Sequence, residues 1–267
     1  MEYKAAVFDI DGTLLPNGRL KVPLRTQWAL KKLKRRGVRV IIATGRGPAR
    51  ANRAILGGIE YDYIICANGA CILRGDRTIY FVDTYERENI DEIVSISERM
   101  GLEVKFIYLD GYYIFRGGER KKLLYRENKP LEEIFEQDAR ANRKKTEEKG
   151  ELPFAAFVIT EDDRSAEFNA LSAKHSMVPF CKHGYDILKS ETDKVHSITS
   201  VIGEMGIDWS ETVVFGDGLN DLEMIKRAGL GVAMENSAPE VKAAADKIAP
   251  RCEEYGICKA IKEIFYK

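Results

Sequence analysis

Short apolar runs alternate with helically spaced apolar positions along the first third of the chain. Three of these runs are short enough for buried strands, at residues 5–8, 38–43 and 63–66. Between the first two, small and apolar side chains recur at the helical spacing i, i+3, i+4, i+7, namely Thr26, Ala29, Leu30 and Leu33. A second, shorter helix is expected over 49–56. Strands and helices in alternation are typical of a parallel sheet covered by helices.

The pattern changes near Thr84, after a hairpin expected at 72–83. We expect a helix at 86–100, followed by two strands at 104–109 and 112–115 that are joined by the turn signal Asp110-Gly111. A charged helical region at 119–149, a strand at 154–160 and a helix at 161–174 are expected next. Two more strands are expected at 177–181 and 185–188. We therefore predict a separate α+β unit, residues 84–188, inserted into a first domain formed by residues 1–83 and 189–267.

The alternation returns in the last third of the chain. Lys194 begins an expected helix with an apolar stripe formed by Val195, Ile198, Ile202 and Met205. We expect a strand at 212–215, a helix at 222–228 and a strand at 231–234. Another helix begins at Pro239, and a helix at 257–265 closes the chain. The predicted fold class is α/β, a parallel-sheet core with an inserted α+β domain.

The charge balance argues against broad classes of partner. Lys plus Arg and Asp plus Glu each number 42, so no net field attracts nucleic acid or an anionic membrane. The basic residues within 31–36 occupy the last turns of the first helix, before Gly37, where cations complement the helix dipole, and we interpret them as a solvated helix end. No signal peptide or membrane span is recognisable. The five cysteines form no C-x-x-C pair, so a cytoplasmic protein with reduced thiols is expected.

Two acidic residues follow the first predicted strand. Asp9 and Asp11 are one residue apart, and Gly12 after them permits a sharp turn. Two crowded carboxylates repel each other, so the pair makes sense with a cation between them or with one acid protonated. The alternative is an ordinary surface turn after a core strand, where Asp and Gly are common.

Further polar residues follow the other predicted strands. They are Thr44, Asn68, Asp217, Asn220 and Asp221, while Lys194 stands at a helix start. Open α/β sheets place their ligands at the carboxyl ends of the strands. Converging carboxylates suit Mg²⁺, which prefers oxygen ligands and keeps waters that a phosphate oxygen can replace. Thr44, Lys194 and backbone N–H groups are donors that a phosphoryl group needs, and an Asp facing the phosphorus could attack it.

Three other sites can begin with the same residues. A dinucleotide site needs G-x-G-x-x-G, but Arg50 and Asp221 stand where the two candidate stretches would need their third glycine. A calcium loop needs glycine sixth and glutamate twelfth, whereas glycine is fourth and Leu20 is twelfth here. A signalling receiver domain would need an Asp at the end of the third strand, where Asn68 stands. None of the three fits well.

The motifs as a set resemble those of the haloacid dehalogenase-like phosphatases, in their order and spacing. The set is Asp9-Ile-Asp-Gly-Thr, Thr44, Lys194 and Gly216-Asp-Gly-Leu-Asn-Asp221. Thr44-Gly45-Arg46, Ala67-Asn68-Gly69 and Gly231-Val-Ala-Met-Glu-Asn236 resemble the Cof-type branch, which carries a large α/β cap. The resemblance implies a Rossmann-like core with the cap inserted after the third strand.

The resemblance also implies roles for individual residues. Asp9 would be the nucleophile, and Asp11 the general acid and base, with its backbone carbonyl on Mg²⁺. Asp9 and Asp217 would be metal ligands, and Asp221 would support the site without binding the metal itself. The remaining expected phosphate or substrate contacts are Thr44, Gly45, Lys194, Asn220, Arg46 and Asn68. Arg46 either reaches substrate or pairs with an acid on the surface, and Asn68 either contacts substrate or satisfies the turn backbone.

We therefore predict a Mg²⁺-dependent phosphatase of small phosphorylated metabolites, with sugar phosphates as the expected class. The alternatives are a phosphotransferase or phosphomutase that uses the same aspartyl-phosphate, and a non-catalytic module that binds phosphorylated ligands. A pure binder has no need of Asp11, which argues against the last. The expected partner is the substrate, without nucleic acid or membrane. The sequence leaves the oligomeric state open and is compatible with a monomer.

Overall fold

The computed structural model describes residues 3–102, 104–114, 151–160, 175–181, 183–189 and 192–266. The chain divides into two compact units. The first comprises Met1–Arg46, Ala51–Phe81 and Asp193–Lys267, and the second comprises Gly47–Arg50 and Val82–Thr192. None of the helices in the described part of the chain combines the length and the apolar character that a membrane span requires.

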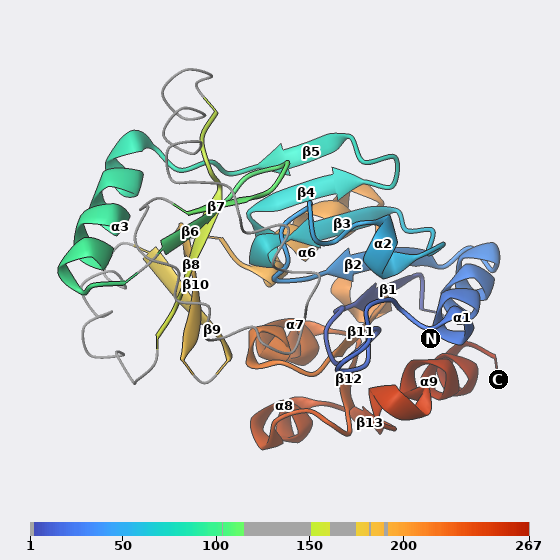
Figure 1. Cartoon of the computed structure of the whole chain (residues 1–267). Coiled ribbons are helices and arrows are strands. Elements are labelled where there is room, and N and C mark those ends of the chain that lie inside the picture. Colours follow the sequence, from blue (N-terminus) through green and yellow to red (C-terminus); the bar gives the residue numbers. More distant parts are fainter. Residues whose placement is uncertain are drawn as a thin grey trace. The chain divides into compact units, whose positions relative to one another are not determined.

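The first unit is built on an eight-stranded sheet with the order β13-β12-β11-β1-β2-β3-β4-β5 (Figure 1). Neighbours from β13 to β3 run parallel, and β4 returns antiparallel to β3. The strands are β1 (Ala5–Phe8), β2 (Arg39–Ala43), β3 (Tyr63–Cys66), β4 (Cys71–Arg74), β5 (Ile79–Val82), β11 (Thr212–Gly216), β12 (Leu230–Met234) and β13 (Lys247–Ala249). The four strands whose ends carry the candidate site residues, β11, β1, β2 and β3, are consecutive in this order.

Helices pack on both faces of this sheet, because its central strands are apolar on both sides. On one face, Val7 and Val214 join Ile198, Met224 and Val241 from α6, α7 and α8 in one buried cluster. Phe8 and Phe215 point to the other face, where their rings stack with centroids 4.8 Å apart. The helices are α1 (Leu24–Arg35), α2 (Arg53–Leu56), α6 (Lys194–Glu204), α7 (Leu222–Arg227), α8 (Pro239–Ala244) and α9 (Gly256–Phe265).

The second unit contains a five-stranded sheet with the order β7-β6-β8-β10-β9, antiparallel throughout. Its strands are β6 (Val104–Ile107), β7 (Tyr112–Ile114), β8 (Ala155–Ile159), β9 (His175–Cys181) and β10 (Gly184–Lys189), and its described helix is α3 (Arg87–Arg99). Ile90, Ile93 and Ile96 of α3 share a cluster with Phe106 and Val158 of the sheet. The helices expected at 119–149 and 161–174 lie outside the described residues.

The predicted fold class is confirmed, since an α/β sheet dominated by parallel strands forms the core. The helix expected at 49–56 is shorter than predicted and covers only Arg53–Leu56. Its start is fixed by Asn52, whose side-chain Oδ1 accepts hydrogen bonds from the backbone N–H groups of Ala54 and Ile55. The three-residue edge strand β13 has too little apolar pattern to have been predicted.

Candidate active site

Asp9 lies at the carboxyl end of β1, in the middle of the sheet. The strand before it is fully buried, and Asp9 itself is only 6% exposed. Its backbone N–H donates to the carbonyl of Phe215 on β11, at 3.0 Å, which continues the strand pairing by one residue. The chain then turns sharply, because the carbonyl of Ile10 accepts from the N–H groups of both Leu14 and Leu15. The carboxylate of Asp9 is therefore held at a fixed point on the sheet edge.

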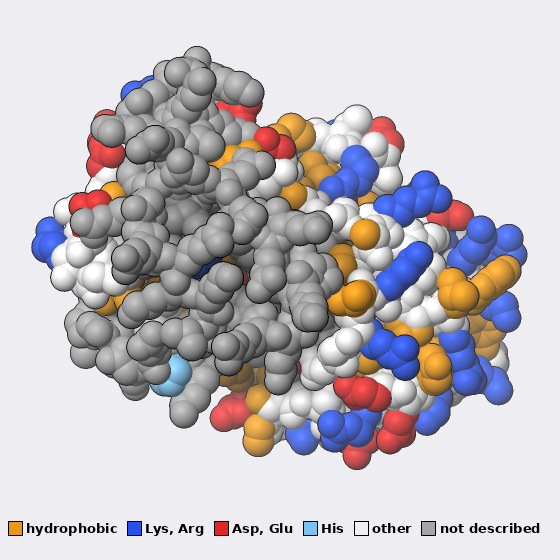
Figure 2. Space-filling model, in the orientation of Figure 1, with side chains coloured by type: hydrophobic (Ala, Val, Ile, Leu, Met, Phe, Trp, Pro, Cys, Tyr) orange, Lys and Arg blue, Asp and Glu red, His pale blue; other side chains and the backbone are white. Residues whose placement is uncertain are grey.

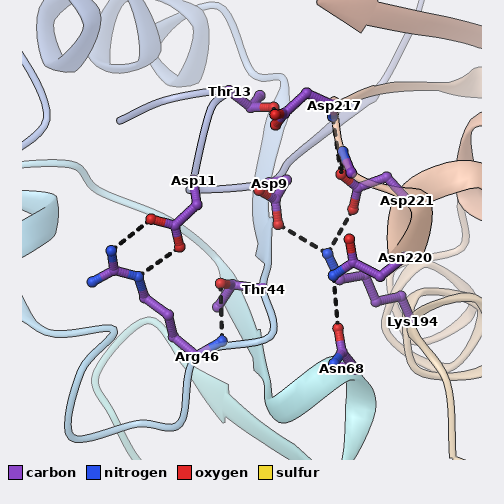
Figure 3. A network of polar contacts seen from close by, with 11 residues as sticks. Asp9, Asp11, Thr13, Thr44, Arg46, Asn68, Lys194, Asp217, Asn220 and Asp221 are labelled. Atoms are coloured by element: carbon purple, nitrogen blue, oxygen red, sulfur yellow. Dashed lines mark hydrogen bonds and ion pairs between the residues drawn. The ribbon is translucent and has the colours of Figure 1, made fainter. Parts of the chain in front are cut away.

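Lys194 connects Asp9 to a second buried carboxylate. Its Nζ donates to Asp9 Oδ1 at 2.9 Å and to Asp221 Oδ1 at 2.6 Å (Figure 3). The lysine is placed by the first turn of α6, which begins at Lys194 and is capped by the side chain of Asp193. The second oxygen of Asp221, Oδ2, accepts from the backbone N–H groups of Asp217 and Gly218, each at 3.0 Å. Asp221 thus fixes both the lysine and the loop after β11.

Asp217 faces the turn that follows Asp9. Its Oδ1 accepts a 2.7 Å hydrogen bond from the hydroxyl of Thr13, and its Oδ2 accepts from the side-chain amide of Asn236 at 3.2 Å. The same amide donates to the carbonyl of Gly12. Gly12 has φ +78°, and a Cβ there would lie 2.0 Å from Asp217 Oδ2. Glycine is required at this position by both the backbone conformation and the close approach of the carboxylate.

Asp11 has a different partner from the buried carboxylates. Its two oxygens accept from Arg46, with Nε to Oδ2 at 2.7 Å and a terminal nitrogen to Oδ1 at 2.6 Å (Figure 3). The Asp11 side chain is 54% exposed, whereas that of Arg46 is 15% exposed. This two-pronged pairing fixes the plane of the Asp11 carboxylate while leaving it open to solvent.

The loops after β2 and β3 supply the uncharged polar groups. The Thr44 hydroxyl is buried and accepts from the backbone N–H of Arg46, so its own proton remains available to another acceptor. Gly45 lies between these two residues. Asn68, at φ +51°, accepts through Oδ1 from the amide of Asn220 at 3.0 Å. The structure thus brings together all the residues for which the sequence predicted a role at the site.

Burial and like charges shape the protonation of this cluster. Burial, with Asp221 as the largest charge contribution, raises the pKa of Asp9 well above its ordinary range, although Lys194 acts in the opposite direction. Burial likewise raises the pKa of Asp217 to about 7, and the hydrogen bond from Thr13 opposes this shift. Burial acts to lower the pKa of Lys194, but the carboxylates of Asp221 and Asp9 outweigh it, so the pKa is raised and the lysine stays charged.

The acidic cluster fits a divalent cation. Oxygens of Asp9, Asp217 and Asp221 lie within 4.8 Å of one another, and Lys194 supplies one positive charge against these three carboxyl groups. Asp221 is completely buried, and its oxygens accept from the Lys194 ammonium and from two backbone N–H groups. Asp217 is only partly buried and accepts from the neutral side chains of Thr13 and Asn236, so Asp9 and Asp217 are the better ligands. An oxygen-only donor set is the type that Mg²⁺ and similar hard cations prefer. A bound cation would also reverse the raised pKa values of Asp9 and Asp217.

Comparison with known proteins identifies this arrangement. The family described as haloacid dehalogenase-like hydrolase matches residues 6–261. The chain belongs to this family. The family predicted from the motifs is thereby confirmed, and members of this family generally use a divalent metal.

Relatives and solved structures of the haloacid dehalogenase-like family extend the comparison. The putative phosphatase YkrA of Bacillus subtilis is 29% identical over 274 residues, covering 99% of this chain and 98% of the relative. The structure of BT1666 from Bacteroides thetaiotaomicron, a phosphatase of the same superfamily, has a TM-score of 0.85 at 22% identity, over 98% and 95% of the two chains. The subclass IIB sugar phosphatase BT4131 has a TM-score of 0.77 at 25% identity, over 97% and 98%. Together they support a phosphoric monoester hydrolase.

Two residues of this site were not singled out from the sequence. Thr13 and Asn236 both donate to Asp217, yet in the sequence each appeared only inside a longer motif. Asn236 lies beyond the end of β12, the neighbour of β11, so its position at a strand end was the available signal. The pairing of Arg46 with Asp11 could not be chosen over a substrate contact until the geometry was known.

Proposed function

We propose that this chain is a Mg²⁺-dependent phosphatase of small phosphorylated metabolites, with sugar phosphates as the substrate class, and that Asp9 carries the phosphoryl group between two half-reactions. The observation that supports this most directly is the buried Asp9 carboxylate, held through one oxygen by Lys194 beside a cluster of further acids. The name of the sugar phosphatase BT4131 supports the substrate class.

In the first half-reaction, a carboxylate oxygen of Asp9 forms a bond to phosphorus while the bond from phosphorus to the alcohol oxygen breaks. Lys194 orients the nucleophile, since its Nζ lies 2.9 Å from Asp9 Oδ1. Asp11 gives its proton to the departing alkoxide. The exposure of the Asp11 side chain leaves it accessible to a leaving group, and Arg46 sets the direction in which it points.

In the second half-reaction, water attacks the phosphorus of the aspartyl-phosphate. Asp11 takes a proton from that water, the bond between phosphorus and the Asp9 oxygen breaks, and inorganic phosphate and the Asp9 carboxylate are released. Asp11 returns to its protonated form, so protons and bonds balance over the cycle.

Mg²⁺ held by Asp9, Asp217 and the backbone carbonyl of Asp11 would neutralise charge on the phosphoryl oxygens. The chain's own donors complete the phosphate site. They are the Thr44 hydroxyl, the backbone N–H of Gly45, the Lys194 ammonium and the Asn220 amide, with Arg46 and Asn68 at its margin. Asp221 contributes by fixing Lys194 and the backbone of Asp217 and Gly218.

The experiment is phosphate release from a panel of sugar, polyol and nucleoside phosphates, with Mg²⁺ and with chelator. We expect release from sugar phosphates that needs Mg²⁺, is absent in Asp9→Asn and is normal in Asp91→Asn, which removes an exposed carboxylate on α3. Phosphate release that persists in Asp9→Asn would refute the role of Asp9 as the nucleophile. Stoichiometric phosphate transfer between two sugars, without free phosphate, would indicate a phosphotransferase or phosphomutase instead.

A further inference from the structure

The charges of this neutral chain are distributed very unevenly. Residues 12–59 contain no Asp or Glu and carry twelve Lys and Arg side chains. This stretch includes α1, which has no acidic residue along its length. The overall balance of charges therefore conceals a strongly basic stretch, which belongs to the first unit except for residues 47–50.

The outward face of α1 is also apolar. Thr26, Gln27, Leu30 and Leu33 face the core, so the opposite side of the helix carries Leu24 and Trp28, one turn apart. Leu24 is 68% exposed and Trp28 is 56% exposed, and Leu20 in the preceding loop is 57% exposed. These are among the largest exposures of any large hydrophobic side chain in the described residues. A merely solvated helix has no need of these side chains on its outer face.

Basic side chains surround these apolar ones. Arg25, Lys32 and Arg35 are exposed on the same helix, and Figure 2 shows hydrophobic and basic side chains side by side over the region of α1. Two acids beside α1 pair with basic residues other than these three: Glu60 with Lys31 of α1, and Asp62 with Lys34 of α1 and with Arg39. We call Leu20, Leu24, Trp28, Arg25, Lys32 and Arg35 the Trp28 patch.

We propose that the Trp28 patch binds the surface of an anionic lipid membrane. Leu and Trp side chains that protrude among Lys and Arg are the composition of helices that lie in the membrane interface, where apolar groups enter the acyl boundary and cations meet anionic headgroups. The patch attaches the enzyme to the surface and does not span the bilayer.

Other occupants fit the same features less well. A second copy of the chain would bring Arg25, Lys32 and Arg35 against their own equivalents across a twofold axis, with no acid on α1 to offset them. A stable protein interface needs about 800 Å² on each side, more than three apolar side chains provide. Nucleic acid would use the cations and could stack on Trp28, but it offers no apolar partner to Leu20 and Leu24.

Co-sedimentation with vesicles tests the proposal, using phosphatidylcholine alone and phosphatidylcholine with about 30% phosphatidylglycerol. Binding should occur only with the anionic lipid and should fall at about 0.5 M salt. Leu24→Ser/Trp28→Ser and Lys32→Glu/Arg35→Glu should each weaken binding about tenfold or more. Matched controls are Ile248→Ser, which removes a side chain 52% exposed on β13, and Lys226→Glu on α7. Both should bind as the wild type does.

A second readout uses the two tryptophans of the chain, Trp28 and Trp209. In a Trp209→Phe background, Trp28 is the only indole, so its emission should shift to the blue when anionic vesicles are added. Turnover of p-nitrophenyl phosphate should be unchanged in every patch variant, which verifies the fold. No binding to anionic vesicles, equal loss in the controls, or binding to single-stranded DNA without binding to vesicles would each overturn the proposal.

Discussion

Replacing Lys194 with methionine should lower the free energy of unfolding, because the buried acidic cluster then has no cation. The lysine is 3% exposed and its Nζ contacts Asp9 Oδ1 and Asp221 Oδ1, with Asp221 completely buried. Methionine has a similar length but no charge, so packing is largely kept while the two carboxylates lose their shared cation. Removing one partner of a buried ion pair typically costs about 3–5 kcal/mol. That is a large part of the roughly 5–15 kcal/mol by which proteins of this kind are stable.

The loss should depend on pH in a direction that follows from the cluster. Burial already raises the pKa of Asp9, and without the lysine this carboxyl should hold a proton to still higher pH. The folded variant then binds one proton more than its unfolded chain, so its stability increases as pH falls, by up to about 1.4 kcal/mol per pH unit. The deficit relative to the wild type should therefore be largest near pH 8 and smaller near pH 6.

Urea unfolding at pH 8, 7 and 6, without metal, measures both effects. Lys226→Met is the control, because Lys226 forms a surface pair with Glu223 and its loss should change stability by no more than about 0.5 kcal/mol. A deficit for Lys194→Met below about 1 kcal/mol, or one that is the same at all three pH values, would show that Lys194 does not neutralise the buried carboxylates.

Four further predictions concern the chemistry and the fold. Asp11→Asn should release about one equivalent of phenol from p-nitrophenyl phosphate in a burst and then stall, since a good leaving group needs no acid but hydrolysis needs the base; rapid-quench kinetics showing a normal steady state would contradict this. Because burial raises the pKa of Asp217 to about 7, Mg²⁺ affinity measured by calorimetry should fall about fivefold between pH 7 and pH 6. The activity of Asp217→Asn, unlike that of Asp9→Asn, should partly recover at high Mg²⁺. Burial acts to raise the pKa of Asp62, but hydrogen bonds from Lys34, Arg39 and the Val40 N–H lower it overall. Asp62→Asn should therefore reduce the free energy of unfolding by about 1–3 kcal/mol at neutral pH, as measured in thermal unfolding scans. The reduction should be smaller in acid, below the pKa that Asp62 has in the folded protein.

Much of the fold could be read from the sequence because the central strands are almost purely apolar. Ala5–Phe8 and Tyr63–Cys66 are observed with the predicted bounds. The site could be anticipated because polar residues at the ends of neighbouring parallel strands must meet at one sheet edge. Pairings between side chains could not be predicted in this way. Arg46 contacts Asp11 only because the loop after β2 folds back toward the turn after β1, and such geometry leaves no mark on hydrophobic periodicity.

The central place of β1 in the sheet has a consequence for the folding of the chain during its synthesis. This apolar strand is synthesised before β11, which pairs with one of its edges and is made about 200 residues later. At about 5–20 residues per second, that edge waits on the order of 10–40 seconds for its partner. During synthesis the nascent chain therefore carries an unpaired hydrophobic strand, the kind of surface that chaperones shield and that associates with other chains when left uncovered.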